Sequence, residues 1–208
     1  MQRLKPTNSG FTIVELMIAT LVFSVILLLA TYGILNIGRL YRKSITSNRT
    51  QQTARSIIDT VAQNLKFNGG NFVAGTNVYC LGSNKRLSLI TNVQFVNNTS
   101  HGLVIDDTAC SSTSSTQDLT KSTIAGKELL GPRMRLAKFY ICDNTMGTDS
   151  NCSSIASSLK DNTYYIFLRV IYGDNDLLSP GNQNCNTNAG REFCAMSEVS
   201  TYVQKVIQ

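Results

Sequence analysis

The N-terminal part of the chain is dominated by one apolar run, residues 11–38. Its sequence is FTIVELMIATLVFSVILLLATYGILNIG, and Glu15 is its only charged residue. A transmembrane helix needs about 20 predominantly apolar residues, so the run is long enough to cross a bilayer. A secretory signal peptide has a shorter apolar region followed by a small-residue cleavage site, and no such site follows Gly38. We therefore expect the run to be a retained membrane helix.

Helical periodicity continues beyond the run in amphipathic form. Five residues recur at helical spacing and form an apolar stripe: Ala54, Ile57, Ile58, Val61 and Leu65. The opposite face is polar and carries Arg55, Asp59, Gln63 and Lys66. Gly69 and Gly70 form a stop signal, because glycine readily adopts the left-handed conformation at a helix end. The sequence predicts one helix from Phe11 to about Lys66, with the stripe packed on the rest of the chain.

After Gly70 the composition changes to that of β-structure. The strongest predicted strands are Met134–Cys142 and Thr163–Tyr172, which are rich in β-branched and aromatic residues. Weaker strand signals lie in residues 86–96, 102–106 and 198–207, and residues 173–176 have turn chemistry. The polar stretches 110–123 and 179–188 are typical of surface loops. We expect one antiparallel sheet docked on the helix.

All six cysteines follow the helix: Cys80, Cys110, Cys142, Cys152, Cys185 and Cys194. They form no CxxC pair, and His101 is the only histidine, which argues against a zinc site. An even, widely spaced set indicates disulfides and an oxidising compartment. Connectivity stays open, although Cys142–Cys152 and Cys185–Cys194 could each close a short local loop. Disulfides place this part outside the cytoplasm and the residues before the run inside.

The net charge of +6 is spread thinly, and loss of Arg3 and Lys5 with a leader would lower it to +4. A nucleic-acid binder needs a clustered basic face, so the charge does not indicate DNA. DNA or a host surface stays open as a partner without being indicated. The densest basic group is Arg133, Arg135 and Lys138. Strand alternation predicts that the two arginines share one face and that the lysine points to the other.

The start of the chain combines a short basic leader, Gly10, the aromatic Phe11 and Glu15 at the fifth position after the glycine. This combination resembles the type IV prepilin and pseudopilin family. The resemblance implies that a prepilin peptidase cleaves after Gly10 and methylates Phe11. It also implies that Glu15 pairs with the N-terminal amine of a neighbouring subunit, and that the partners are other pilins, the peptidase, the membrane and an inner-membrane assembly platform.

The family architecture is an α+β, pilin-like fold: a long N-terminal helix, embedded in the membrane over its first half, packed against a C-terminal antiparallel sheet with disulfides. The expected parts are a cleaved leader (1–10), the membrane and assembly half of the helix (11–38), its amphipathic half (39–68) and a disulfide-rich globular domain (71–208). Many major pilins have a proline midway through the membrane helix. This run has none, and Gly33 and Gly38 are weaker substitutes.

The predicted function is that of a structural subunit, a minor pilin or pseudopilin of a type IV pilus or a type II secretion-like filament. Its size and its cysteine-rich exterior favour a minor subunit over a major one. It would be a single-pass membrane protein with an extracytoplasmic domain before assembly, and part of an extracellular filament afterwards. The alternative is a membrane-anchored extracytoplasmic adhesin or receptor that does not polymerise.

No catalytic motif, phosphate loop or paired-carboxylate pattern is present, so we expect neither an enzyme nor a cofactor. His101 is predicted to lie on the surface. Asp174 and Asp176 match a calcium loop only weakly, so no metal ligand is assigned. Five aromatic residues are expected to fill the sheet core, with an exposed binding face as the alternative: Tyr140, Tyr164, Tyr165, Phe167 and Tyr172.

Overall fold

The structure is a computed structural model, and it describes residues 10–68, 71–96, 99–111, 117–146, 150–179, 181, 184–186 and 193–206. The predicted leader before Gly10, the Gly69–Gly70 stop and parts of both polar loops lie outside these residues. The chain divides into two compact units, Met1–Tyr41 and Arg42–Gln208, which are described separately below.

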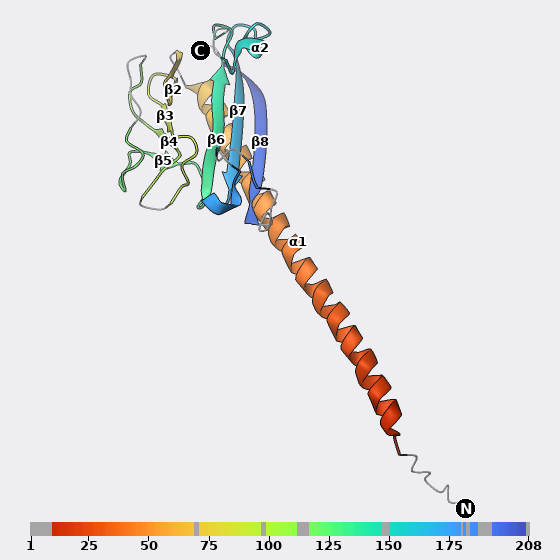
Figure 1. Ribbon diagram of the computed structural model, residues 1–208. Coiled ribbons are helices and arrows are strands. Elements are labelled where there is room, and N and C mark those ends of the chain that lie inside the picture. Colours follow the sequence, from red (N-terminus) through yellow and green to blue (C-terminus); the bar gives the residue numbers. More distant parts are fainter. Residues whose placement is uncertain are drawn as a thin grey trace, which may run out of the picture. The chain divides into compact units, whose positions relative to one another are not determined.

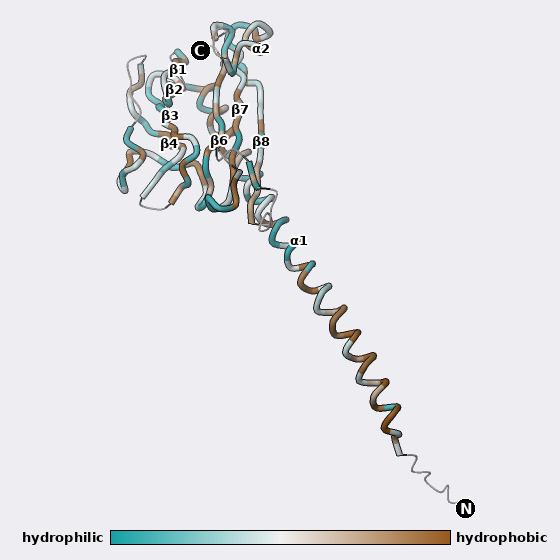
Figure 2. The backbone as a smooth tube through the Cα atoms, in the orientation of Figure 1, coloured by the Kyte–Doolittle hydropathy of each residue, from teal (hydrophilic) through white to brown (hydrophobic). Residues whose placement is uncertain are grey.

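Helix α1 (Ile13–Phe67) is continuous, close to the prediction of Phe11 to about Lys66. Its first turn is capped, because the Thr12 hydroxyl accepts the backbone N–H of Glu15 at 3.3 Å. Gly33 lies inside the regular helix, with nothing of the chain within 4 Å of a Cβ built there. The hydropathy colouring shows α1 as largely hydrophobic over its N-terminal part (Figure 2).

In the second unit, α1 contributes its predicted apolar stripe to the core. The stripe residues Ala54, Ile57, Ile58, Val61 and Leu65 are all buried. Thr50 extends the buried face by one turn and is fully buried, because its hydroxyl donates to the Thr46 carbonyl at 2.8 Å and satisfies itself locally. The period of the apolar residues therefore identified the docking face correctly, apart from the threonine at its start.

Five short antiparallel strands form the first sheet, in the order β1 to β5. They are β1 (Phe72–Gly75), β2 (Val78–Leu81), β3 (Arg86–Leu89), β4 (Leu103–Asp106) and β5 (Lys127–Glu128). The tight β1–β2 connection uses Asn77 at a φ of 60°, a conformation that asparagine tolerates better than most residues. The 86–96 signal thus yields a strand only over its first four residues.

The second sheet has three antiparallel strands in the order β6-β7-β8. They are β6 (Met134–Cys142), β7 (Thr163–Tyr172) and β8 (Ala195–Gln204), and the first two match the predicted bounds. The short helices α2 (Ser153–Ala156) and η1 (Asn175–Leu177) lie in the connections (Figure 1). The α+β, pilin-like fold with disulfides is confirmed. The expectation of one sheet is wrong, because β5 and β6 do not pair.

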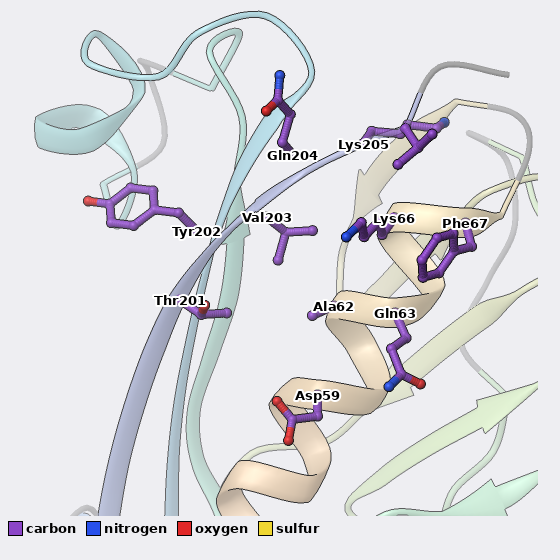
Figure 3. Close-up of a pocket in the computed structure, with 11 residues that line it drawn as sticks. Asp59, Ala62, Gln63, Lys66, Phe67, Thr201, Tyr202, Val203, Gln204 and Lys205 are labelled. Carbon is purple, nitrogen blue, oxygen red and sulfur yellow. The ribbon is translucent and has the colours of Figure 1, made fainter.

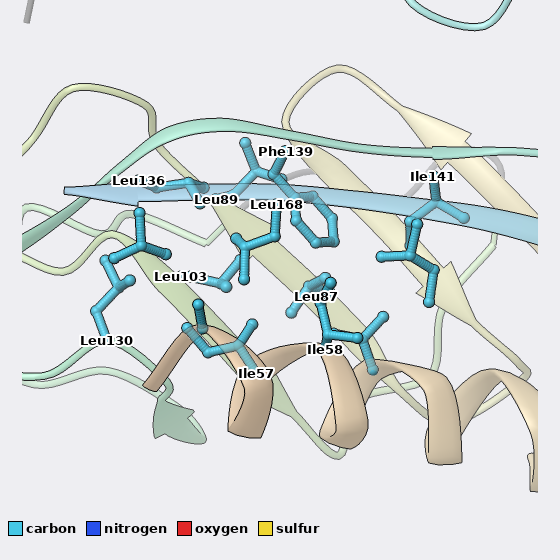
Figure 4. Packing of buried hydrophobic residues seen from close by; sticks show 14 of the residues in the cluster. Ile57, Ile58, Leu87, Leu89, Leu103, Leu130, Leu136, Phe139, Ile141 and Leu168 are labelled. Carbon is cyan, nitrogen blue, oxygen red and sulfur yellow. The ribbon is translucent and has the colours of Figure 1, made fainter. Parts of the chain in front are cut away.

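The main core joins both sheets to α1. Figure 4 shows Ile57 and Ile58 from the helix meeting Leu87 and Leu103 from the first sheet, with Leu168 arriving from the second. All five belong to one cluster of buried apolar side chains. Each sheet turns one apolar face toward α1, and the helix supplies the surface against which both pack. The stripe therefore packs against both sheets of the globular unit.

A β-bulge corrects the predicted orientation of the basic residues on β6. The register shifts between Leu136 and Lys138, so Arg135 lies opposite Ile171 while Lys138 lies opposite Arg169. Ile171 and Arg169 are two residues apart on β7 and share a face, which places Arg135 and Lys138 on the same face. The prediction that Arg135 and Lys138 lie on opposite faces of the strand is therefore wrong. The bulge inserts one extra residue between them, which shifts the alternation by one position and returns Lys138 to the face of Arg135.

Replacing Ile57 by alanine is expected to lower the free energy of unfolding by about 2–5 kcal/mol, because a side chain that is 1% exposed leaves a cavity. The measurement is denaturant unfolding of the full chain in detergent, followed by near-ultraviolet circular dichroism. Ile45→Ala is the matched control, since Ile45 lies on the same helix but is 48% exposed. Equal losses for the two variants would contradict the packing described here.

Candidate assembly site

Gly10 and Phe11 precede the first turn of α1. A Cβ placed on Gly10 would meet nothing within 4 Å, and Gly10 is not among the residues of positive φ. Neither close approach nor backbone conformation therefore requires glycine at this position. Phe11 is 76% exposed and packs in no core cluster of the described residues. Packing among the described residues therefore does not account for this pair.

Glu15 sits in the first turn of α1, where a negative charge is favoured by the helix dipole. Its backbone N–H is bonded to the Thr12 hydroxyl, and no carboxylate ion pair is formed with any described residue. Threonine followed three residues later by glutamate is the capping-box spacing. That signal was present in the sequence, and it adds a local structural role for Thr12 that the motif alone does not reveal.

Glu15 is surrounded by exposed apolar side chains. Every large apolar residue of the run is exposed, from 47% at Val25 to 81% at Ile13. Among the described helices, α1 has the length and composition needed to cross a membrane. Such a surface is stable only when lipid or other protein covers it. A glutamate within it costs about 2.5–3.5 kcal/mol at a bilayer centre and less near the interface, so a cationic partner would be strongly favoured.

Three disulfides close loops in the globular unit: Cys80–Cys110, Cys142–Cys152 and Cys185–Cys194. The last two are the local loops that the spacing allowed. The first connects β2 to the segment after β4, and its sequence separation of 30 is the longest of the three. The bridges thus fix the peripheral segments and leave the α1 stripe to hold the centre.

Loop length predicts unequal contributions from two of these bridges. In the chain-entropy picture, a loop of 30 residues is worth about 3.6 kcal/mol and one of 10 residues about 2.7 kcal/mol. Replacing Cys80 and Cys110 together by alanine should therefore lower the free energy of unfolding by about 1 kcal/mol more than replacing Cys142 and Cys152. Unfolding midpoints of the two double variants check this order, and the reverse order would contradict it.

The turn that follows β7 holds an ion-pair network. Asp174 accepts hydrogen bonds from Arg133 and from the Gln94 amide, which is 3.1 Å away, and these donors lower the pKa of Asp174. Arg135 is 1% exposed and donates to the Asn175 side chain at 2.8 Å and the Gly173 carbonyl at 2.9 Å. Asp174 therefore ties the turn to β6, while Asp176 makes no ion pair with the described residues.

His101 is buried, so its predicted place on the surface is wrong. It is 7% exposed, its ring packs on Phe95, and its Nδ1 lies 3.4 Å from a carboxylate oxygen of Glu128. Glu128 accepts three backbone N–H groups, those of Gly102, Leu103 and Leu130. Burial nevertheless raises the pKa of Glu128. The pair joins β5 to the start of β4.

The five aromatic residues are divided between the two faces of the second sheet. Tyr164 lies in the main core, with its ring 5.1 Å from that of Phe72. On the other face, Phe167 stacks on Tyr140 at 4.8 Å, and Tyr165 lies 5.0 Å from Tyr202. Tyr202 is 63% exposed. Tyr172 borders the core and is partly buried. The sheet core therefore explains only some of these aromatics.

A groove of about 690 Å³ lies between the end of α1 and β8. Figure 3 shows Asp59 and Lys66 on its helical wall and Val203 and Lys205 on the other. Asp59 is the only acidic residue among its described lining. The described lining of the groove therefore contains no pair of carboxylates of the kind that glycoside hydrolases use.

Comparison with known families identifies the N-terminal segment. Residues 5–31 match the family model described as the prokaryotic N-terminal methylation motif. The chain therefore carries the type IV prepilin signature, typical of substrates of prepilin peptidase that assemble with other pilins. Proteins with this motif are structural and not enzymatic. Neither a curated protein nor a solved structure matches the chain.

Proposed function

We propose that this protein is a structural subunit, a minor pilin or pseudopilin, that is cleaved between Gly10 and Phe11 and assembled into a filament through residues 11–38. The observation that carries the proposal is the position of the methylation motif on a helix whose apolar side chains over residues 11–38 are not covered by any described residue. A plain membrane anchor explains the apolar surface. It does not explain Gly10, Phe11 and Glu15 at these positions.

Cleavage would create the partner that Glu15 lacks. The new N-terminal amine on Phe11 carries a positive charge, and N-methylation preserves that charge. In the apolar surroundings of packed helices, an amine and a carboxylate attract each other strongly, while an unpaired carboxylate is costly. A neighbouring subunit that presents its amine to Glu15 would therefore be accepted in one register only.

The proposed division of labour follows the chain. Residues 11–38 hold the subunit in the membrane and later in the filament, residues 39–68 connect them to the core, and residues 71–208 form the extracytoplasmic surface. Minor status is supported by the cysteine-rich exterior, whose three bridges would be laborious to form at every position of a filament. This subunit performs no chemistry of its own.

Processing tests the proposal directly. Coexpression with an active prepilin peptidase should remove residues 1–10 and methylate Phe11, as read by intact mass and fragmentation of the N-terminus. Gly10→Val should block cleavage, whereas Gly33→Ala, which also adds a side chain in open space, should leave it unchanged. If the leader stays intact on coexpression with active peptidase, the result would contradict the proposal and favour an anchored adhesin or receptor.

Assembly tests the role of Glu15. Glu15→Leu should be processed and inserted at least as well as the wild type, because it removes a charge from an apolar helix. It should nevertheless be depleted at least tenfold from sheared filaments, since a pairing energy of about 1.4 kcal/mol or more is lost. Quantitative mass spectrometry of the filament fraction measures this. Wild-type incorporation of the variant would support the non-polymerising alternative.

A further inference from the structure

The segment that follows the apolar run is cationic and lacks acidic residues. No aspartate or glutamate occurs between Glu15 and Asp59, whereas Arg39, Arg42 and Lys43 follow Gly38 within five residues. These three cations, called here the cationic segment, are all exposed. None forms an ion pair with a described carboxylate. Their charge is therefore not neutralised by the residues that the structure describes.

No described carboxylate of the globular unit forms an ion pair with these cations. Lys43 lies seven residues before Thr50, on the same face of α1, yet Thr50 is fully buried and Lys43 is exposed. The docked face therefore ends between these residues. Arg42 approaches the ring of Phe193 at 5.9 Å, a contact that leaves the guanidinium charge unneutralised.

The depth of the cationic segment follows from helix geometry. At 1.5 Å per residue the apolar run measures about 42 Å, close to the ~40–45 Å of a bilayer with its headgroups. Residues 39–43 should therefore fall at the level of the phosphates. Tyr41 lies among them and is 67% exposed, as is typical of the aromatic belt at a membrane interface.

The cations also oppose the usual topology signal. Three cations after the run and two before it would favour a cytoplasmic globular domain. The three disulfides require the opposite orientation. Positive charge on the translocated side therefore needs a compensating interaction. Phosphates supply one, because arginine forms paired hydrogen bonds with them and long cationic side chains reach sideways to headgroups.

We infer that Arg39, Arg42 and Lys43 bind the phosphates of anionic phospholipids in the leaflet that faces the globular domain. This inference rests on the proposed membrane location of residues 11–38, but not on cleavage or filament assembly. The bound lipid would hold the end of the apolar run at the membrane surface. It would have to be released before the helix moves into a filament.

The test uses the full, unprocessed chain in detergent with equal amounts of phosphatidylglycerol and phosphatidylcholine, and counts bound lipids by native mass spectrometry. The wild type should retain several-fold more phosphatidylglycerol. Combined Arg39→Gln, Arg42→Gln and Lys43→Gln should abolish the preference. Arg49→Gln, Arg55→Gln and Lys66→Gln, which removes equal charge from exposed positions further along α1, should keep it.

Absence of a preference in the wild type, or equal losses in both triple variants, would overturn the inference. Displacement of the lipid by inorganic phosphate or by a short DNA duplex at equal concentration would overturn the assignment to lipid. A variant with Arg39→Lys and Arg42→Lys keeps the charge and should keep the preference. If this lysine variant loses the preference for phosphatidylglycerol while its disulfides and circular dichroism are unchanged, that result would also count against lipid binding by these cations. Because processing is absent from this experiment, its outcome is independent of the cleavage test.

Discussion

Apolar burial on α1 is the constraint on which the rest of the structure depends. The stripe from Ala54 to Leu65 is covered by both sheets, whose named strands do not pair with each other. Backbone hydrogen bonds join residues 92–95 to the start of β6, and the packing of both sheets on α1 adds the apolar contact between them. The apolar run receives no such cover from the part of the chain that the structure describes. Apolar surface has to be removed from water in both parts of α1. The stripe is covered by packing within the chain, and the apolar run needs lipid or other subunits to cover it.

This arrangement explains why the disulfides and the ion pairs are distributed as they are. The three bridges fasten segments around the sheets, and the Arg133–Asp174 pair fastens the turn after β7 to the start of β6. None of these interactions involves the apolar run. The described interactions that stabilise the globular unit are therefore separate from the apolar run.

Local patterns in the sequence predicted the elements well. Helical spacing located the stripe, and β-branched and aromatic residues located β6 and β7 to the residue. Predictions that depended on non-local contacts were less successful. His101 is buried because Phe95 and Glu128 come to it from distant segments, and the bulge after Leu136 cannot be seen in an alternating pattern. The separation into two sheets is likewise a matter of tertiary pairing.

For the candidate site, the sequence motif is more informative than the structure. Gly10, Phe11 and Glu15 were identified from the motif, and the structure offers no packing reason for them, so their roles in cleavage, methylation and pairing stay predictions. Thr12 is not one of these three residues, and its spacing to Glu15 has the form of a capping box, a local signal of a helix start. The motif concerns recognition by other proteins, and such information lies in the sequence without leaving a trace in the isolated fold.

The central claim, that Glu15 is completed by another subunit, is tested most directly by zero-length amine-to-carboxylate cross-linking of filaments sheared from producing cells. The account predicts cross-linked peptides that join Glu15 of this chain to the N-terminal amine of a different polypeptide. Recovery of the processed chain in filaments, with Glu15 cross-linked to no other subunit while the globular domains are cross-linked normally, would contradict it.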